Sequence, residues 1–581
     1  MSLSVIRGVL SIGRQKTYLR KHVFSSSRTL VTTDCSHPNV LKSELSDVVV
    51  PDWTICEMLY PKLELYHKYT AVECASSGKS YTFGQIRMKS RNFSKALKEK
   101  LKLKKGDIVA ILVKNIPEFG IAAYGIFEAG LVVTTLNPAY TPDEIKKQLL
   151  DSGARAIITQ ASDFCKVKSA LEIMHSQIPI IVIKEKQADS IPSGAIDFFE
   201  FADTVINVPD IEPGHTSDLA FLPYSSGTTG LPKGVELTHN NIVSNIFQFN
   251  HKDVSFLNPP TDNFQDVIPT VLPLYHIYGF TAGTVNSAYN GTKSVTLDKF
   301  SPELFITVLK NHRVTVIYAA PPLILFLTSH QDVKKEYFKY VKMVISGGAP
   351  LGCLDEQRFT DKVGSHVTIT QAYGLTETSP LVTWFPKTYA KNENGGCIGK
   401  VVPKTYVKII APDDPTGTPL GMNQSGELLV KGPQVMRGYY NRPEETEKSF
   451  LNGWFRTGDL GHFNDEGCMF ITDRLKELIK VKGFQVAPAE LEELIRSFPG
   501  VDDAAVIGIP NQAHGEVPRA YVVPKEGFAL NVEEIKEYVA IKVTKYKQLA
   551  GGVQIVDTIP KNPSGKILRR LLKQNYKEKG I

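Results

Sequence analysis

The segment with the clearest chemical character is a loop rich in glycine and hydroxyl side chains. It reads Tyr224-Ser-Ser-Gly-Thr-Thr-Gly-Leu-Pro-Lys-Gly-Val235. Glycines let the backbone approach an anion, hydroxyl groups add hydrogen-bond donors, and Lys233 adds a positive charge. The GxxxxGK[ST] spacing of a Walker loop is absent. The composition indicates a phosphate-binding loop, although a cluster of Gly, Ser and Thr is by itself more often a plain surface turn.

Four further segments carry groups that could act on the same phosphates. In chain order they are Gln371–Thr378 (QAYGLTET), Trp454–Asp459 (WFRTGD), Asp473–Lys480 (DRLKELIK) and Pro560–Lys566 (PKNPSGK). Where two anions such as a carboxylate and a phosphate meet at 4 Å, like charges repel by about 4 kcal/mol at an effective dielectric near 20. Cations and fixed dipoles must offset that repulsion, and Lys233 is one source of positive charge.

Together the five segments resemble the motifs of the adenylate-forming (AMP-binding) superfamily, which includes acyl-CoA synthetases, 4-coumarate–CoA ligases and firefly luciferases. They occur in the order and approximate spacing of that family, and the resemblance covers about residues 45–575. It implies an acid–thiol ligase that makes acyl-AMP and pyrophosphate from ATP and a carboxylic acid. CoA then takes the acyl group and AMP leaves. ATP and CoA would be co-substrates, and Mg²⁺ would be the cofactor.

The elements that position these motifs are predicted to form an α/β protein. Short apolar runs alternate with helical patterns from about residue 80 to 460, which favours mainly parallel sheets flanked by helices. After Asp473 the pattern becomes a compact α+β unit. The resemblance adds a β-barrel-like subdomain and makes the C-terminal unit small and mobile. The predicted division is a large AMP-binding domain at 45–472, a hinge at 473–476 and a small domain at 477–581.

Individual elements can be placed from the apolar pattern. In the large domain we expect strands at 107–113, 156–159, 179–183, 315–318 and 343–346, and a helix at 116–129. In the small domain we expect helices at 488–498 and 532–543, strands at 504–509, 520–523 and 553–556, and a final amphipathic segment at 564–573.

The resemblance also assigns the ATP site. Its residues would be Ser225, Ser226, Gly227, Thr228, Thr229, Gly230, Lys233, Gln371, Tyr373, Thr376, Asp459, Arg474 and Lys476. Asp459 would accept both ribose hydroxyls, because an ionised carboxylate has two acceptor oxygens. Tyr373 would cover the adenine. Glu377 would help to hold Mg²⁺, which favours oxygen ligands shared with phosphates.

Two poses of the small domain are implied. In one pose Lys566 bridges the carboxylate and the α-phosphate, for which a lysine is a compact donor. In the other the face that carries Lys480 is presented for thioester formation. The residues implied in CoA binding are Lys299, Lys482, Gly483 and Gln485, with Gly483 leaving room for the pantetheine arm.

The acid pocket is indicated by Leu272-Pro-Leu-Tyr-His-Ile-Tyr-Gly-Phe280, which resembles the PMFHIY segment of 4-coumarate–CoA ligases. The acid-binding residues implied are His276, Tyr278, Gly347, Gly348 and Ala372, and His276 would also be catalytic. Trp384 would shorten the pocket or stack on an aromatic acid if it points inward, and would otherwise be part of the core. The acid is therefore expected to be aromatic or a short- to medium-chain fatty acid.

Three other functions stay open to different degrees. A luciferase-like adenylating oxygenase is disfavoured because Phe247–His251 has Gln248 where luciferases carry arginine. A non-catalytic nucleotide-binding relative would be expected to lose Glu377, Asp459 or Lys566, all of which are present. An amino-acid adenylation domain is disfavoured because no acidic residue occupies the region of His276.

Composition bounds the partners. The net charge of +7 includes six basic residues and no acid within 1–33, so the rest of the chain is near +1 and gives no case for nucleic-acid binding.

The Ser-rich basic segment 1–33 fits a cleaved mitochondrial transit peptide, hence a matrix location; a basic tail on a cytoplasmic protein is the alternative. The C-terminal Lys579-Gly580-Ile581 is not a peroxisomal signal. No apolar run is long enough for an integral membrane segment, the seven scattered cysteines predict neither a metal site nor disulfides, and oligomeric state is not indicated.

Overall fold

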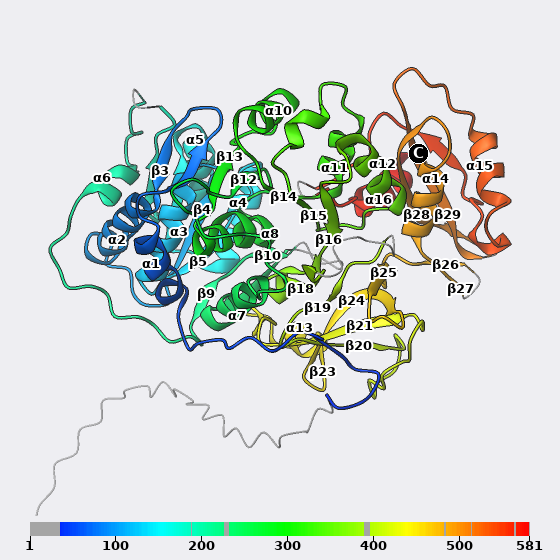
Figure 1. The fold of residues 1–581 in the computed structure, drawn as a ribbon, viewed down its shortest axis with the longest axis horizontal. Coiled ribbons are helices and arrows are strands. Elements are labelled where there is room, and N and C mark those ends of the chain that lie inside the picture. The colour runs from blue at the N-terminus through cyan, green and yellow to red at the C-terminus, as the bar shows by residue number, and fades with distance from the viewer. Residues whose placement is uncertain are drawn as a thin grey trace, which may run out of the picture. The chain divides into compact units, whose positions relative to one another are not determined.

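The computed structural model describes residues 35–186, 189–225, 232–387, 396–481, 484–512, 514–562 and 565–579. The predictions made for residues 1–33, 226–230, 482 and 483, and for the side chain of Gln485, lie outside this description. The described elements form an α/β protein with several sheets (Figure 1).

The largest sheet has a parallel centre. Its strand order is β10-β11-β9-β5-β4-β6-β7-β8, with β22 paired to β11. The central strands β5 (Val132–Thr135), β4 (Ile108–Leu112), β6 (Ala156–Gln160) and β7 (Ile180–Ile183) pair in parallel and are buried throughout. Such continuous burial is typical of a parallel sheet covered on both faces. The strands predicted at 107–113, 156–159 and 179–183 are confirmed, as is the helix predicted at 116–129, which is α3 (Glu118–Glu128).

Two smaller sheets complete the parallel part. In one, β12 (Val267–Thr270), β13 (Lys293–Thr296) and β2 (Thr70–Cys74) are parallel, and β3 (Ser80–Thr82) is antiparallel at the edge. In the other, β14 (Val316–Ala319), β15 (Met343–Ser346) and β16 (Thr368–Gln371) are all parallel. These strands confirm the predictions at 315–318 and 343–346.

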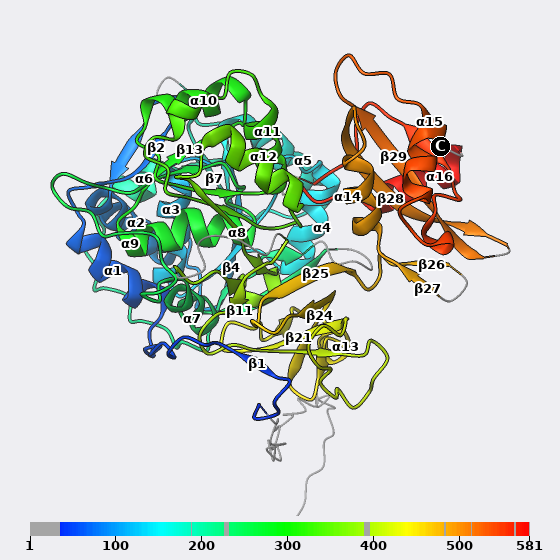
Figure 2. The same ribbon diagram turned by 45° about the vertical axis from the view of Figure 1, so that its right-hand side comes forward.

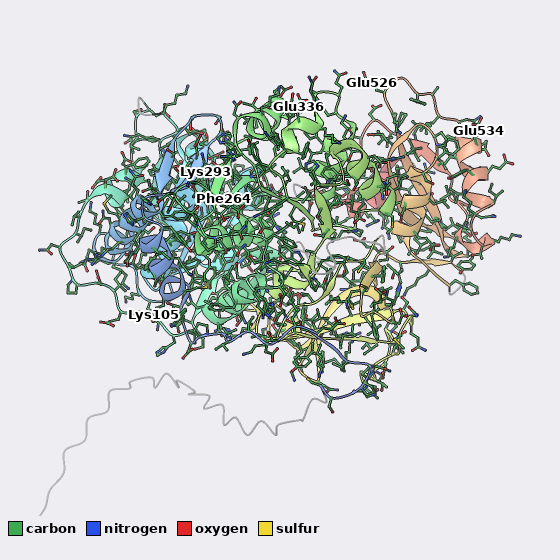
Figure 3. All side chains as sticks on the ribbon, in the orientation of Figure 1. Lys105, Phe264, Lys293, Glu336, Glu526 and Glu534 are labelled. Carbon is green, nitrogen blue, oxygen red and sulfur yellow. The ribbon has the colours of Figure 1, made fainter. Side chains whose placement is uncertain are left out.

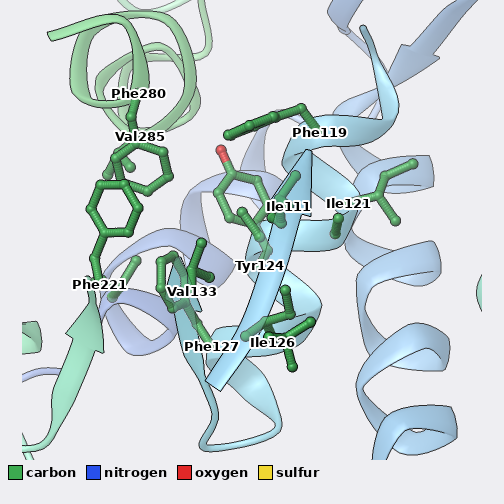
Figure 4. Close-up of a cluster of buried hydrophobic side chains, with 14 of the residues drawn as sticks. Ile111, Phe119, Ile121, Tyr124, Ile126, Phe127, Val133, Phe221, Phe280 and Val285 are labelled. Atoms are coloured by element: carbon green, nitrogen blue, oxygen red, sulfur yellow. The ribbon is translucent and has the colours of Figure 1, made fainter. Parts of the chain in front are cut away.

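The main core fixes the position of α8 (Ile277–Phe280), the short helix that begins immediately after His276. Phe280 is fully buried, and its ring centroid lies 4.3 Å from that of Phe221 and 6.2 Å from that of Phe127 (Figure 4). Burial of one such side chain contributes about 1.5–3 kcal/mol. The aromatic cluster therefore holds the residue that precedes the helix in a defined place.

The stretch that precedes the hinge is antiparallel. Strands β1 (Leu41–Lys42), β20 (Tyr406–Ile410), β21 (Gly426–Lys431), β24 (Trp454–Phe463) and β23 (Phe450–Leu451) follow one another in the sheet, and β25 (Met469–Arg474) pairs with β24. The alternation of strands and helices predicted from about residue 80 to 460 did not indicate this antiparallel sheet. Strands joined by short connections pair antiparallel, whereas parallel neighbours need a crossover. This sheet is the subdomain that the family resemblance implied.

The small domain contains a five-stranded sheet with helices on it (Figure 2). Its elements are β26 (Ile479–Val481), β27 (Phe484–Val486), α14 (Pro488–Arg496), β28 (Val501–Asn511), β29 (Gly515–Pro524), α15 (Val532–Ala540), β30 (Val553–Ile555) and α16 (Arg569–Lys579). The strands and helices predicted here are confirmed, and the sequence pattern missed the hairpin β26–β27.

The last amphipathic segment differs from the prediction. The helix begins at Arg569, whereas an amphipathic segment was expected at 564–573. Gly565 has φ +83°, and the Asn562 N–H donates to the Lys566 carbonyl at 2.9 Å, so a turn precedes the helix. A left-handed glycine ends regular structure at little steric cost. This turn contains Lys566, the lysine that the sequence predicts for adenylation.

Charged residues such as Glu336, Glu526 and Glu534 are exposed at the surface (Figure 3). Across the described ranges, none of the helices has both the length and the apolar character that crossing a membrane would require.

Candidate active site

One cavity of about 920 Å³ collects most of the residues predicted for the site. The predicted residues that line it are Ser225, Lys233, His276, Tyr278, Gly347, Gly348, Ala372, Tyr373, Thr376, Glu377, Arg474, Lys476 and Lys566. They come from both domains and are up to 341 positions apart in sequence, so the fold alone brings them together. The cavity has an apolar end near His276 and a charged end near Lys233. Between them is a wall near Tyr373, here called the nucleotide wall because the adenine is predicted to lie there.

Parallel pairing explains how the wall between these ends is built. Strands β15 and β16 end side by side, and the chain continues from them as Gly347-Gly348 and Ala372-Tyr373. Ligands of open α/β sheets bind at the carboxyl ends of strands in this way. A Cβ on Gly347 would lie 3.1 Å from Cε1 of Tyr278 and 3.3 Å from the Ala372 carbonyl oxygen. A larger residue at position 347 would therefore require the Tyr278 ring or the Ala372 backbone to shift by a few tenths of an ångström.

Asp459 lies behind the nucleotide wall. It is 3% exposed, and it is not among the residues that line the cavity. The Tyr373 hydroxyl donates to its Oδ2 at 2.6 Å, and Nε of Arg474 lies 2.9 Å from its Oδ1. Asp459 and Arg474 are opposite each other in the β24–β25 ladder, which is why they pair. Asp459 holds the Tyr373 and Arg474 side chains in place; the predicted ribose contact stays a prediction.

The charged end contains Lys233, Glu377 and two residues that the sequence did not indicate. The Lys233 ammonium contacts the carboxylate of Glu445 and lies 5.0 Å from the ring centroid of Tyr439. The Tyr439 hydroxyl donates to Oε1 of Glu377 at 3.0 Å. Burial and the neighbouring Lys476 lower the pKa of Lys233, while Glu377 opposes that shift. These contacts make a compact network in which a phosphate chain could compete for the lysine.

The donor set at this end fits a Mg²⁺ ion shared with phosphates. Glu377 offers a carboxylate that lines the cavity beside Thr376. Among the described residues, no three His, Cys, Asp or Glu side chains lie together as a metal cage. Mg²⁺ commonly binds through one or two carboxylates, water and substrate phosphates.

Lys566 reaches the cavity from the small domain. Its backbone N–H donates to Oδ1 of Asn562 at 2.8 Å, which stabilises the turn. Burial lowers the pKa of its amine to about 8, with the positive charge of Arg474 as the next contribution. A desolvated ammonium near a second cation would be stabilised by a phosphate anion. Lys566 therefore lines the cavity with a lowered pKa, and its role in adenylation stays a prediction.

The apolar end begins at His276. Its Nδ1 accepts the Tyr278 backbone N–H at 3.3 Å, and burial lowers its pKa to about 4. The ring is therefore neutral near pH 7, and the proton is on Nε2 because Nδ1 accepts. The Tyr278 hydroxyl donates to the Ile345 carbonyl at 3.1 Å, which fixes its ring along the cavity.

Trp384 lines this end and also belongs to a buried hydrophobic cluster, so it takes both of the positions that the sequence left open. It is 4% exposed, and its ring packs edge-on against Phe249 at 5.2 Å and Tyr318 at 6.4 Å. These contacts hold the indole in place, and together with Phe249 and Leu381 it forms an apolar wall.

Sequence comparison identifies the family to which these motifs belong. A sequence model described as AMP-binding enzyme matches residues 62–440, and one described as AMP-binding enzyme C-terminal domain matches residues 490–566. The protein 4-coumarate–CoA ligase 3 of Oryza sativa subsp. japonica is 37% identical over 544 residues, covering 92% of this chain and 94% of the relative.

The chain belongs to the AMP-binding enzyme family. It is an ATP-dependent, AMP-forming acid–CoA ligase.

Solved structures show that the fold of this ligase is shared. ATP-bound MatB from Rhodopseudomonas palustris matches with a TM-score of 0.80 at 27% identity, over 90% of this chain and 99% of that one. The o-succinylbenzoate CoA synthetase (MenE) of Bacillus subtilis, in complex with the acyl-adenylate OSB-AMP, matches with a TM-score of 0.75 at 28% identity, over 89% and 97%. The predicted architecture, a large α/β domain with a β subdomain and a small α+β domain, is confirmed.

Several residues predicted for the ligase site lie outside the cavity. The Gln371 amide donates to Glu356 Oε1 at 2.8 Å and to the Leu351 carbonyl at 2.9 Å, so it supports the chain after β15. Lys299 and Lys480 are exposed and do not line the cavity. Their assignments to ATP, CoA and thioester formation stay predictions.

Sequence reasoning missed Glu445 and Tyr439 of the ligase. Both lie in the segment Gly438-Tyr-Tyr-Asn-Arg-Pro-Glu-Glu445, which carries no glycine-rich or lysine-bearing motif. Strand β22 (Gly438–Tyr439) pairs antiparallel with β11 (Lys233–Thr238), and this pairing brings both residues to Lys233. From sequence they could have been found only by predicting that β22 pairs with β11.

Proposed function

We propose that the acid substrate is an aromatic acid or a short- to medium-chain fatty acid that carries no charged group besides its carboxylate. The observation that carries the proposal is the lining of the apolar end, formed by Phe249, His276, Tyr278, Ile345, Leu381 and Trp384. None of these side chains is charged near neutral pH, since the pKa of His276 is about 4. A charged group on the acyl chain would be buried here without a partner, which costs several kcal/mol. The 4-coumarate–CoA ligases among the relatives act on an acid of the aromatic kind.

The roles proposed for the site follow from the positions in the cavity. The acid carboxylate lies between the neutral His276 and Lys566, and the ATP phosphates lie at Lys233. Glu377 would hold Mg²⁺ together with the phosphates, and the ion would supply charge neutralisation there. Lys566 donates to the α-phosphate and the attacking carboxylate, where negative charge must be brought together.

The second half-reaction uses a different pose of the small domain in our proposal. Lys480 is exposed here, away from the cavity that Lys566 occupies. Rotation at Asp473–Lys476 would exchange the two lysines, and Lys299, Lys482, Gly483 and Gln485 would then contact CoA.

A CoA-thioester screen of the full chain tests the substrate. The screen measures kcat/KM for aromatic acids without a second charged group, C4–C12 fatty acids, dicarboxylates and amino acids. We expect turnover to concentrate in the first two groups. A dicarboxylate or an amino acid as the best substrate would contradict the proposal, and light emission with luciferin would support the oxygenase alternative instead.

We also propose that residues 1–33 direct the protein to the mitochondrial matrix. The support is compositional: six basic residues, no acidic residue and many serines. A reporter fused to residues 1–40 should enter mitochondria and be shortened. A reporter that remains cytosolic would support the cytoplasmic alternative.

A further inference from the structure

The Lys233 ammonium has a carboxylate partner in the structure. The partner is Glu445, on helix α13 (Pro443–Lys448), and both side chains line the cavity. Lys233 is well covered, with 17% of its side chain exposed, whereas 40% of the Glu445 side chain is exposed. The lysine is thus held within the cavity wall, and the glutamate approaches it from the open side.

The position of Glu445 is built into the fold. The Thr446 hydroxyl donates to the Arg442 carbonyl at 2.9 Å and accepts the Tyr439 backbone N–H at 2.9 Å. Arg442 in turn contacts Asp151 of the large sheet domain. Helix α13 is therefore fixed at both its start and its middle, so Glu445 is presented to Lys233 by a supported element.

A polyphosphate that binds Lys233 must compete with this carboxylate. Two unit negative charges 4 Å apart repel by about 4 kcal/mol at an effective dielectric near 20. Glu377 lies on the other side of Tyr439 and adds a second carboxylate to the same end. Lys476 and Arg442 are neighbouring cations that lower the pKa of Lys233, and Lys448 also lines the cavity. Glu445 differs from Glu377 because its carboxylate contacts the Lys233 ammonium itself.

We propose that Glu445 sets the affinity of the phosphate end by competing for Lys233, so that it weakens the binding of pyrophosphate after adenylation and speeds its release. When a phosphate chain is bound, the Glu445 carboxylate leaves Lys233 and faces solvent. When pyrophosphate begins to leave, the carboxylate returns to the lysine. This proposal rests on the assignment of Lys233 to the phosphates of ATP.

The test compares Glu445→Gln with Glu444→Gln in the full-length protein. Glu444 is on the same short helix but is exposed, so it controls for a change of net charge. We expect Glu445→Gln to bind Mg²⁺-pyrophosphate and Mg²⁺-ATP about 5- to 30-fold tighter, equivalent to about 1–2 kcal/mol. Calorimetric Kd values and the inhibition constant of pyrophosphate measure this. AMP, which lacks the β- and γ-phosphates, should bind with unchanged affinity.

Two further variants separate the possible failures. Lys233→Met should weaken pyrophosphate binding, and adding Glu445→Gln to it should give little extra change, because the competing pair no longer exists. If Lys233→Met leaves pyrophosphate affinity unchanged, the phosphate assignment of Lys233 is wrong. If Lys233→Met weakens pyrophosphate but Glu445→Gln does not tighten it, or weakens it, only the proposed competition is overturned. An effect of Glu444→Gln equal to that of Glu445→Gln would also overturn it.

Discussion

The Tyr373 hydroxyl donates a 2.6 Å hydrogen bond to Asp459, a carboxylate that lies behind the cavity wall and is also paired with Arg474. Tyr373, which lines the cavity, is thus hydrogen-bonded to a buried carboxylate. Any ribose hydroxyl that reaches Asp459 must share its oxygens with these two partners.

Tyr373→Phe should lower stability in a way that ATP partly restores. Without the phenol, Oδ2 of Asp459 loses a partner, and an unsatisfied buried acceptor costs about 1–3 kcal/mol. If the ribose donates to Asp459, the gain in Tm on adding Mg²⁺-ATP will be larger in this variant than in the wild type. Thermal denaturation with and without ATP measures this.

Tyr81→Phe is the matched control for that experiment. Its hydroxyl donates to the buried Glu118 at 2.8 Å, and neither residue lines the cavity. This variant should be less stable than the wild type, and its gain in Tm on adding Mg²⁺-ATP should equal that of the wild type. An equal ATP response in both variants would count against a ribose contact at Asp459.

Lys566→Ala should separate the two half-reactions. Loss of one transition-state donor typically lowers the rate about 10²- to 10³-fold. We expect this loss in ATP–pyrophosphate exchange with the acid present, while thioester formation from supplied acyl-adenylate is retained. Equal loss in both half-reactions would refute the division of labour between Lys566 and Lys480.

The pKa of Lys566, about 8, predicts an alkaline limb in adenylation. The charged amine is needed, so exchange at low ATP should fall as pH rises through about 8. Saturating ATP should move the limb to higher pH, because phosphate anions favour the ammonium. Lys566→Arg should be slower but lack the limb, since guanidinium stays protonated. A limb that persists in this variant belongs to another group.

The same shift predicts a stability effect with a definite sign. The pKa of Lys566 falls from 10.5 to about 8 on folding, so the unfolded chain binds more protons between these values and stability rises with pH across that window. At pH 7 the buried charge is destabilising. Lys566→Met should then stabilise the protein by on the order of 1 kcal/mol after solvent screening, with the gain shrinking toward pH 10.5. The exposed Lys577→Met is the control, and destabilisation by Lys566→Met at pH 7 would contradict the argument.

His276 should act as a neutral donor throughout the usual range of pH. Its pKa of about 4 predicts that KM for the acid stays constant between about pH 5.5 and 8. His276→Gln, which keeps a neutral donor, should retain more activity than His276→Ala. Michaelis profiles across pH check both points; a wild-type inflection near pH 6.5 that His276→Gln abolishes would show a protonated histidine instead.

Trp384→Leu should shift preference toward longer or bulkier acids, because it opens the apolar end where the indole packs on Phe249. Truncation of a buried Phe or Trp to Ala typically costs about 3–5 kcal/mol, and Leu should lose less because it keeps part of the packing. Trp454→Leu is the control: Trp454 is 2% exposed but does not line the cavity. It should lose stability and keep the order of preferred acids. Ratios of kcat/KM over a chain-length series decide, and an unchanged order in Trp384→Leu would exclude this role.

The sequence by itself determined the chemistry and most of the fold. The motifs that carry Lys233, Glu377, Arg474 and Lys566 could be predicted because each is a short run whose residue types suit phosphate chemistry. Buried strands such as β4 and β6 could also be predicted, since their apolar runs are local. The change to antiparallel pairing after β16, from about residue 373 onward, was not visible in that pattern.

Only the tertiary structure decided which groups meet. Glu445 lies 212 positions after Lys233 and reaches it through the pairing of β22 with β11. Asp459 is absent from the cavity lining because its carboxylate is covered by Tyr373 and by Arg474, its partner in the β24–β25 ladder. Trp384 lines the apolar end of the cavity because its ring packs on Phe249 and Tyr318. Strand register and side-chain packing fix such contacts, and both depend on residues far apart in the chain.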